Sequence, residues 1–208
     1  MSERQMLHPI RMLAAILGIS ISAACADAPR AGLKSDPVAR SVAVADLFQT
    51  RLQSRLSEAL ANGGPVAAVG VCAEAAPAIA AEVSAETGTI VRRVSLHPRN
   101  PGAATSDALM SRLESLEKEP VDAAGQPSLA HWTEGEGRDS THNTLRAVIM
   151  RDQPCGACHG TAIADDVAAA ITERYPQDRA TGIVAGELRG AILISWLQHE
   201  GAASGESR

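Results

Sequence analysis

Large apolar side chains recur in a helical rhythm in the first third of the chain. Four of them stand at every fourth position: Phe48, Leu52, Leu56 and Leu60. This spacing places them on one face and predicts a helix over 41–62, which the glycine pair ending at Gly64 terminates. Pro65 can open a second helix, because proline is tolerated in a first helical turn. Pro77 interrupts the pattern that follows, so we expect two helical pieces with a bend between them.

The rest of the chain mixes strand and helix patterns. Short runs rich in β-branched and apolar residues predict four strands, at 89–96, 129–133, 144–150 and 190–197. The glycine-rich segment 134–139 can join the second and third strands as a hairpin. Further helices are expected after Ser106 and over 165–175. This order of elements predicts an α+β domain in which helices pack on an antiparallel sheet.

The composition is that of a folded protein with few large rings. Hydrophobic residues make up 45% and charged residues 21% of the 208 positions, which excludes wholesale disorder. Only one Phe, one Tyr and two Trp are present, so the core is built from smaller aliphatic residues or is completed by a bulky cofactor. The net charge of -5 argues against a nucleic-acid partner, which would favour a basic surface.

The N-terminus has the layout of an export signal. A positively charged start precedes an apolar run over 12–21, and Ala24-Cys25-Ala26 fits a cleavage site. Alternatively, Cys25 is the acylated residue of a lipoprotein, and only then would the protein touch a membrane. Export places the chain in an oxidising compartment such as a bacterial periplasm. The predicted parts are a signal peptide (1–26), a flexible tether (27–40), a folded domain (41–200) and a disordered tail (201–208).

The strongest chemical motif is Cys155-Gly156-Ala157-Cys158-His159. C-x-x-C-H is the attachment motif of c-type haem. Two thiols three positions apart can reach the two vinyl groups of one porphyrin, and the next residue places an imidazole beneath the iron. A thioredoxin-like pair or half of a zinc site are the alternatives, and neither has its usual surroundings in this sequence. We therefore expect one haem c, covalently attached through Cys155 and Cys158 with His159 as an axial ligand.

The second axial ligand is less certain from the residues. The candidates are Cys72, His97, His131, His142, Met110 and Met150. Cysteine counting favours Cys72, because Cys25 is removed or acylated and the two motif cysteines are consumed as thioethers. A lone thiol in an oxidising compartment is a ligand or a liability, although a buried structural cysteine remains the alternative.

Six short blocks carry a family resemblance: Val69–Cys72 with Ala76-Pro77, Val91–Leu96, Arg99–Pro101, Cys155–Gly160, Tyr175–Asp178 and Gly186–Ala191. In this order they resemble domain-of-unknown-function family 3365, a group of exported monohaem proteins and sensor ectodomains. The resemblance implies a PAS-like antiparallel sheet flanked by helices, with covalent haem c. It also implies axial ligation by the His of C-x-x-C-H and the Cys of the first block, here His159 and Cys72.

Three arginines in these blocks are candidates for binding the haem propionates: Arg93, Arg99 and Arg189. The guanidinium fork matches a carboxylate, so arginine is the natural partner of such groups. Ordinary salt bridges on the surface are the alternative for each of them.

Three functions are compatible with such a haem. A thiolate ligand stabilises ferric iron, and its release would open a site for a diatomic gas, as a redox or gas sensor requires. The alternative is a low-potential periplasmic electron carrier, whose ligands would stay in place. A peroxidase-like enzyme would need a distal acid–base group such as His131 or His142, and nothing in the sequence places either near the iron. We therefore expect a sensor rather than an enzyme, with a diatomic gas or a redox protein as partner.

Overall fold

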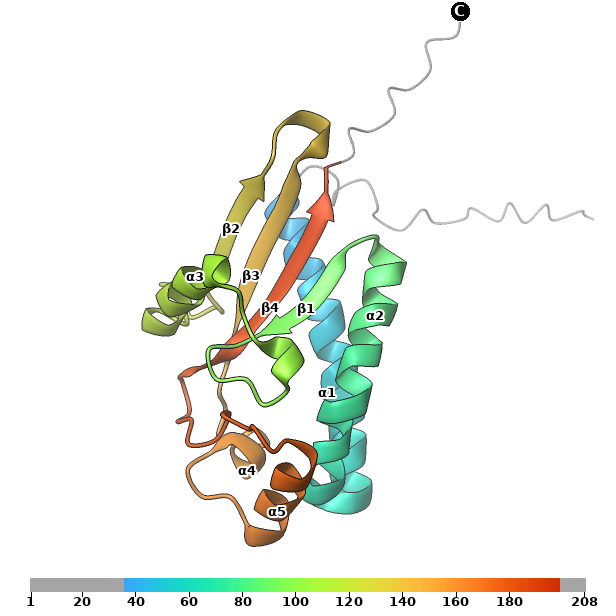
Figure 1. Cartoon of the computed structure of the whole chain (residues 1–208), viewed down its shortest axis with the longest axis vertical. Helices are drawn as coiled ribbons and strands as arrows, with labels where there is room; N and C mark the ends of the chain where they lie inside the picture. The colour runs from blue at the N-terminus through green and yellow to red at the C-terminus, as the bar shows by residue number, and fades with distance from the viewer. Residues whose placement is uncertain (1–35, 199–208) are drawn as a thin grey trace, which may run out of the picture.

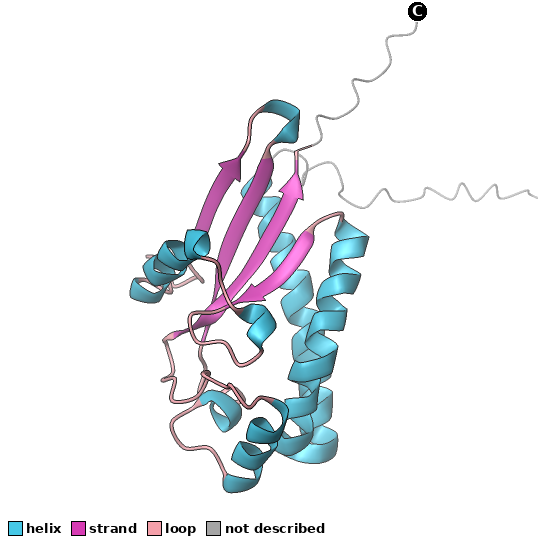
Figure 2. Cartoon of the chain, viewed as in Figure 1, coloured by secondary structure: helices cyan, strands magenta, loops and turns pink. Residues whose placement is uncertain are grey.

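The computed structural model describes residues 36–198, which form one antiparallel sheet flanked by helices (Figures 1 and 2). In chain order the helices are α1 (Pro37–Gly70), the π-helical turn η2 (Val71–Ala75), α2 (Ala76–Thr87), α3 (Asp107–Lys118), α4 (Gly156–His159) and α5 (Asp165–Arg174). The strands are β1 (Ile90–Val94), β2 (Leu129–Glu134), β3 (Thr141–Ile149) and β4 (Leu188–Leu197). The predicted signal peptide 1–26 with Cys25, and the predicted tail 201–208, lie outside the described residues.

The four strands are arranged in the order β1-β4-β3-β2, and every neighbouring pair is antiparallel. Strands β2 and β3 form the predicted hairpin, with register pairs running from Leu129↔Arg146 to Glu134↔Thr141. The α+β class predicted from the order of elements is therefore confirmed. The PAS-like assignment came from the family resemblance and stays a prediction.

Helix α1 begins four residues earlier than the hydrophobic pattern indicated. The Asp36 carboxylate accepts hydrogen bonds from the backbone N–H groups of Val38 and Ala39, and Pro37 occupies the first helical position. Residues 37–40 were predicted as part of a flexible tether, and that part of the prediction is wrong. The sequence Asp-Pro is a helix start here because proline needs no hydrogen-bond acceptor in the first turn.

The chain reverses direction at Gly64, as the glycine pair predicted. Gly64 has φ 68° and ψ -168°, a backbone conformation that only glycine adopts readily. Pro65 then opens the returning helical segment, so α2 runs antiparallel to the first part of α1 (Figure 1). The result is a helical hairpin that lies along one face of the sheet.

The expected bend at Pro77 is absent, because the chain makes a wide turn just before it. The π-helical turn η2 precedes α2, and the N–H of Ala76 donates to the carbonyl of Val71, five residues back. Pro77 has no N–H to offer, so a regular helix would lose a hydrogen bond there. One π turn accommodates the proline while the helical path continues from Pro65 to Thr87. The predicted break into two pieces is corrected to this continuous path.

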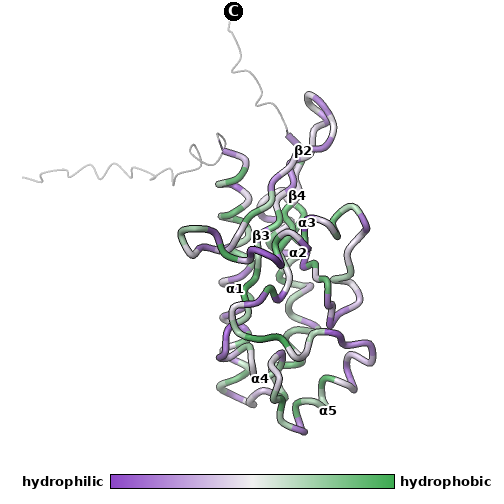
Figure 3. Tube along the Cα trace, turned by 90° about the vertical axis from the view of Figure 1, so that its left-hand side faces the viewer, coloured by the Kyte–Doolittle hydropathy of each residue, from purple (hydrophilic) through white to green (hydrophobic). Residues whose placement is uncertain are grey.

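The hydrophobic core has two main layers, one on each face of the sheet. The first packs the helical hairpin against β1 and β4 and contains Val44, Ala45, Phe48, Ile79, Val83, Val91, Ile192 and Ile194. The second packs α3 on the other face and contains Val94, Leu113, Leu116, Leu145, Ala147, Leu188, Ala191 and Leu193. A smaller cluster joins the end of α1 to α5, below the sheet in Figure 1. Along the chain, apolar stretches follow the inner helices and strands and polar ones the outer loops (Figure 3).

We expect Gly64→Ala to destabilise the fold, because alanine is strained at a φ of 68°. The cost should be about 1–3 kcal/mol, and the midpoint of urea unfolding should fall accordingly. Asn62→Ala, on the exposed surface two residues away, is the matched control and should leave the midpoint nearly unchanged. Equal midpoints for the two variants would mean that the reversal does not depend on glycine.

Candidate functional site

An apolar cavity of about 570 Å³ lies between the helical hairpin, the sheet and α4. Its volume falls within the range of about 300–1,000 Å³ that is usual for pockets binding small organic ligands. The residues predicted from sequence as haem attachment points, ligands or propionate partners all line it: Cys72, Arg93, Arg99, Cys155, Cys158, His159 and Arg189. The fold thus brings together side chains that are up to 117 positions apart in the sequence, between Cys72 and Arg189.

The apolar stripe of α1 extends beyond the protein core into this cavity. Phe48 is only 1% exposed and belongs to the core, whereas Leu52, Leu56 and Leu60 are only half-buried and line the cavity. Sequence analysis recognised the stripe but assigned it no binding role. The segment Pro37–Thr87 is also long and apolar enough to cross a membrane by length and composition. The reversal at Gly64 divides it, and its apolar sides face the sheet and the cavity.

The C-x-x-C-H motif forms the single turn of α4. Cys155, Cys158 and His159 stand at positions i, i+3 and i+4, so they share one face of the turn. All three cysteines within residues 36–198, including Cys72, are free and half-buried. Burial raises the pKa of the Cys158 thiol, and Arg99 opposes that rise. The turn therefore presents two thiols and an imidazole together to the cavity.

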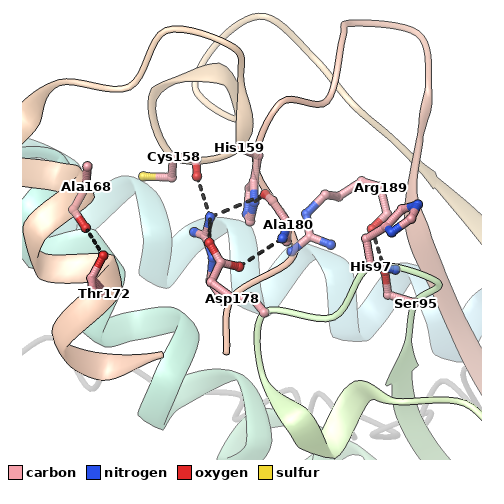
Figure 4. A network of polar contacts seen from close by, with 10 residues as sticks. Ser95, His97, Cys158, His159, Ala168, Thr172, Asp178, Ala180 and Arg189 are labelled. Atoms are coloured by element: carbon pink, nitrogen blue, oxygen red, sulfur yellow. Dashed lines mark hydrogen bonds and ion pairs between the residues drawn. The ribbon is translucent and has the colours of Figure 1, made fainter. Parts of the chain in front are cut away.

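His159 is held as a neutral ring of defined tautomer. Its Nδ1 lies 2.7 Å from the backbone carbonyl oxygen of Ala180, which can only accept, so Nδ1 carries the proton (Figure 4). Burial, and then the positive charges of Arg189 and Arg99, lower the pKa of His159 to about 2. The lone pair of Nε2 is therefore free for a metal ion.

Of the six candidates for the second ligand, only Cys72 lines the cavity. It lies in the π-helical turn η2, a type of turn that is rare and often found at functional sites. Two other candidates, His131 and His142, stack with a centroid distance of 5.6 Å beside Trp196 at a different part of the sheet. His97 is exposed, and its Nε2 lies 4.0 Å from a carboxylate oxygen of Glu117. The geometry thus favours Cys72 among the alternatives that the sequence left open.

Arg93 and Arg189 carry buried donors that have no partner. The Nε atom of each is buried, and within residues 36–198 it has no hydrogen-bond acceptor. Burial is the main cause that lowers the pKa of Arg93, and it lowers that of Arg189 to about 9. A guanidinium keeps its proton in proteins, so two positive charges lie beside the cavity. Two unpaired cations beside an apolar cavity are costly unless an anionic group joins them.

A β-bulge and strand alternation bring these two arginines to the cavity. Strand β3 pairs Val148 with Gly190 and Ile149 with Leu188, so Arg189 is the extra, bulged residue. Bulges re-aim a side chain and are frequent next to functional sites. Arg93 stands two positions from Val91 on β1 and therefore shares its face, which is the face that the helical hairpin covers.

Arg99 lines the cavity and also forms a buried ion pair that was not predicted. Its Nε and Nη2 donate to the two carboxylate oxygens of Asp178 at 3.1 and 3.2 Å. Nη2 also donates to the carbonyl oxygens of Cys158, at 2.5 Å, and Ala180, at 3.3 Å. These protein acceptors engage the Nε and Nη2 atoms of Arg99, a residue that is only 6% exposed. Arg99 as a propionate partner stays a prediction. Its pairing with Asp178, 79 positions along the chain, is a contact that the sequence analysis did not identify.

Tyr175 also lines the cavity and was not predicted as a site residue. It is 7% exposed and packs with Val69 and Ile171. Burial, and then the proximity of Cys72, raise the pKa of its phenol to about 12, so the hydroxyl stays protonated. The only sequence signal was its place in one of the recognised blocks.

We expect Arg189→Met to stabilise the ligand-free protein. The substitution removes a desolvated charge with no anionic partner among the described residues and keeps most of the aliphatic stem. The gain should be about 1–3 kcal/mol, measured as a higher midpoint of urea unfolding. Arg99→Met should have the opposite effect, because it leaves the Asp178 carboxylate unpaired. A loss of stability in Arg189→Met would show that this charge is already compensated.

Comparison with known proteins places the chain in a family. Residues 23–196 match the model of the family described as Tll0287-like. The crystal structure of the cyanobacterial heme-protein Tll0287 aligns with 79% of this chain and 97% of its own, at 26% identity and a TM-score of 0.58. No curated protein matches the chain. The family resemblance seen in the sequence is confirmed, and the chain belongs to the Tll0287-like family.

Proposed function

We propose that this protein is an exported c-type monohaem protein that senses redox state or a diatomic gas. One observation carries the proposal: the C-x-x-C-H turn, the lone Cys72 and two unpaired arginines line the same apolar cavity. The similarity to a structure described as a heme-protein supports the cofactor. The residues present fit a flat apolar ring that bears two carboxylates.

Each part of the cavity has a role in holding that ring. Cys155 and Cys158 would form the two thioether bonds, and the leucines of α1 would contact its apolar surface. Arg93 and Arg189 would bind the propionates, which would supply the anionic partners that their buried donors lack. His159 and Cys72 would be the axial ligands.

When bound, the haem supplies a one-electron redox centre, with an iron position for a gas once a ligand has left. The chain's own groups determine how it behaves. His159 offers a neutral imidazole fixed by the Ala180 carbonyl, and Cys72 offers a thiolate that favours the ferric state. The apolar side chains around them exclude water from the centre.

A sensing role is favoured over electron transport by the unequal holding of the two ligands. The His159 ring is fixed by its hydrogen bond to the Ala180 carbonyl. Cys72 instead lies in a half-buried π-helical turn, for which an ordinary α-helical turn is the alternative conformation. The low-potential electron carrier remains the second candidate. It is favoured by the enclosure of both ligands in one apolar cavity, which would limit reorganisation on electron transfer.

The remaining proposals follow from the motif and from the chain's sequence. Covalent attachment of haem c takes place in exported proteins, so we infer a periplasmic location, with the protein either free or anchored through Cys25. From the family resemblance we also infer a PAS-like haem domain. We also infer that the protein is not a peroxidase. Neither His131 nor His142 lines the cavity, so neither is placed to act as a distal acid–base group.

Optical spectra of the ferric and ferrous protein, produced with a c-type maturation system, test the axial ligands. The ferric wild type should show low-spin thiolate character, and Cys72→Ala should lose it. His97→Ala, at an exposed candidate ligand outside the cavity, is the control and should keep the wild-type spectrum. Identical spectra for all three proteins would exclude Cys72 as a ligand. An electron carrier or an enzyme would then be favoured over a sensor.

Removal of the cofactor tests whether haem completes the core. We expect protein made without haem attachment, or the Cys155→Ala/Cys158→Ala variant, to melt more than about 10 °C below the loaded protein. That difference corresponds to about 3 kcal/mol or more for a chain of this size. The physical reason is the loss of apolar contacts along the cavity together with two uncompensated arginines. Equal melting temperatures would contradict the idea.

A further inference from the structure

We propose that the buried pair Arg99–Asp178 is a clamp that positions His159 and thereby tunes the iron centre. This inference rests on the proposed function, because it assigns a role to residues behind the proximal histidine. Neither residue would touch the cofactor through this contact; both act through the backbone of the loop that holds the imidazole.

The clamp fixes both ends of the histidine's surroundings. Arg99 donates to the carbonyl oxygen of Cys158, the residue before His159, and to the carbonyl oxygen of Ala180. That same Ala180 oxygen accepts the Nδ1 proton of His159 at 2.7 Å. One guanidinium therefore holds the turn that carries the ring and the acceptor that orients it.

Asp178 completes the arrangement from the other side. One of its carboxylate oxygens accepts from Arg99 Nε at 3.1 Å and from the backbone N–H of Ala180 at 2.9 Å. The side chains of the pair are 5% and 10% exposed, so solvent competes little for these hydrogen bonds. Ala180 is itself fully buried, and its backbone cannot shift without losing its hydrogen bonds to Arg99 and Asp178.

The position of the clamp gives it a chemical effect as well as a structural one. The strength and direction of an Nδ1–H hydrogen bond set the orientation and basicity of a metal-bound imidazole. The pair is also close to neutral as a whole, since the carboxylate balances the guanidinium beside His159. Loss of the carboxylate alone would leave a positive charge near the iron, which favours the ferrous state.

Two substitutions separate these effects in the haem-loaded protein. Asp178→Asn removes the negative charge and weakens the bidentate contact, whereas Arg99→Lys keeps the positive charge but loses the fork. Glu86→Gln is the matched control, because it breaks another arginine–carboxylate pair, Arg51–Glu86 at 2.7 Å, on the outer side of the helical hairpin. The readouts are the reduction potential, the ferric electron paramagnetic resonance spectrum and the exchange rate of the His159 Nδ1 proton by NMR.

We expect both site variants to exchange the Nδ1 proton about tenfold faster than wild type and to change the ferric g-values. The reduction potential should become more positive in Asp178→Asn and stay near the wild-type value in Arg99→Lys. Glu86→Gln should match wild type in every readout. A merely structural pair would lower the melting temperature without moving these spectroscopic values.

The clamp is overturned if both site variants retain the wild-type g-values and proton exchange, even where the potential of Asp178→Asn shifts through its charge. If Asp178→Asn does not mature, Arg99→Lys decides alone, since it keeps the charge and most of the side-chain volume. Failure of the proposed function has a separate sign. The wild-type protein itself would then carry no covalent haem, or would not show His159 as a ligand.

Discussion

The helical hairpin and the sheet enclose a cavity between them, and the candidate site depends on that cavity. Three half-buried leucines of α1 line the cavity, and one of them, Leu52, also packs against the core. Arg93 and Arg189 reach the same space with buried donors and no protein acceptor among residues 36–198. An apolar surface that ends in two cations is the complement of an amphipathic ring, so the scarcity of aromatic residues and the unpaired arginines have one explanation.

The two sides of the cavity are built with different stiffness. On the side of α4, His159 is fixed through Ala180 by a network that reaches Arg99 and Asp178. On the side of the hairpin, Cys72 lies in the π-helical turn η2, which has no side-chain cap and is tied to α5 by the exposed pair Glu74–Arg174 at 3.0 Å. Burial, and then the charges of the neighbouring arginines, lower the pKa of His159, so the imidazole on this side stays neutral. The histidine side of the cavity is therefore held more firmly than the cysteine side.

Local patterns predicted most elements of this fold, whereas contacts across the sequence were beyond them. The strand at 89–96 and the reversal at Gly64 follow from β-branched and glycine residues, which act within a few positions. Asp36-Pro37 was misjudged, because the same proline that breaks a helix interior is favoured in its first turn. A covalent motif and family blocks identified seven candidate residues, and the fold brings all seven to one cavity. The pairing of Arg99 with Asp178 could not be predicted from the sequence. A buried arginine can pair with a carboxylate of the haem or of the protein, and the sequence pattern does not distinguish the two.

The π-helical turn explains why the cysteine side is the one suited to change. Pro77 cannot donate a backbone hydrogen bond, so the helix before it has a wider turn, and Cys72 belongs to that turn. A π turn has a near alternative in the ordinary α-helix, and a shift between them rotates the side chains within it. The histidine has no comparable alternative, because its clamp would have to break. If both residues bind the iron, as proposed, one ligand could turn away while the other stays in place. A switch requires such an asymmetry, whereas an electron carrier gains nothing from it.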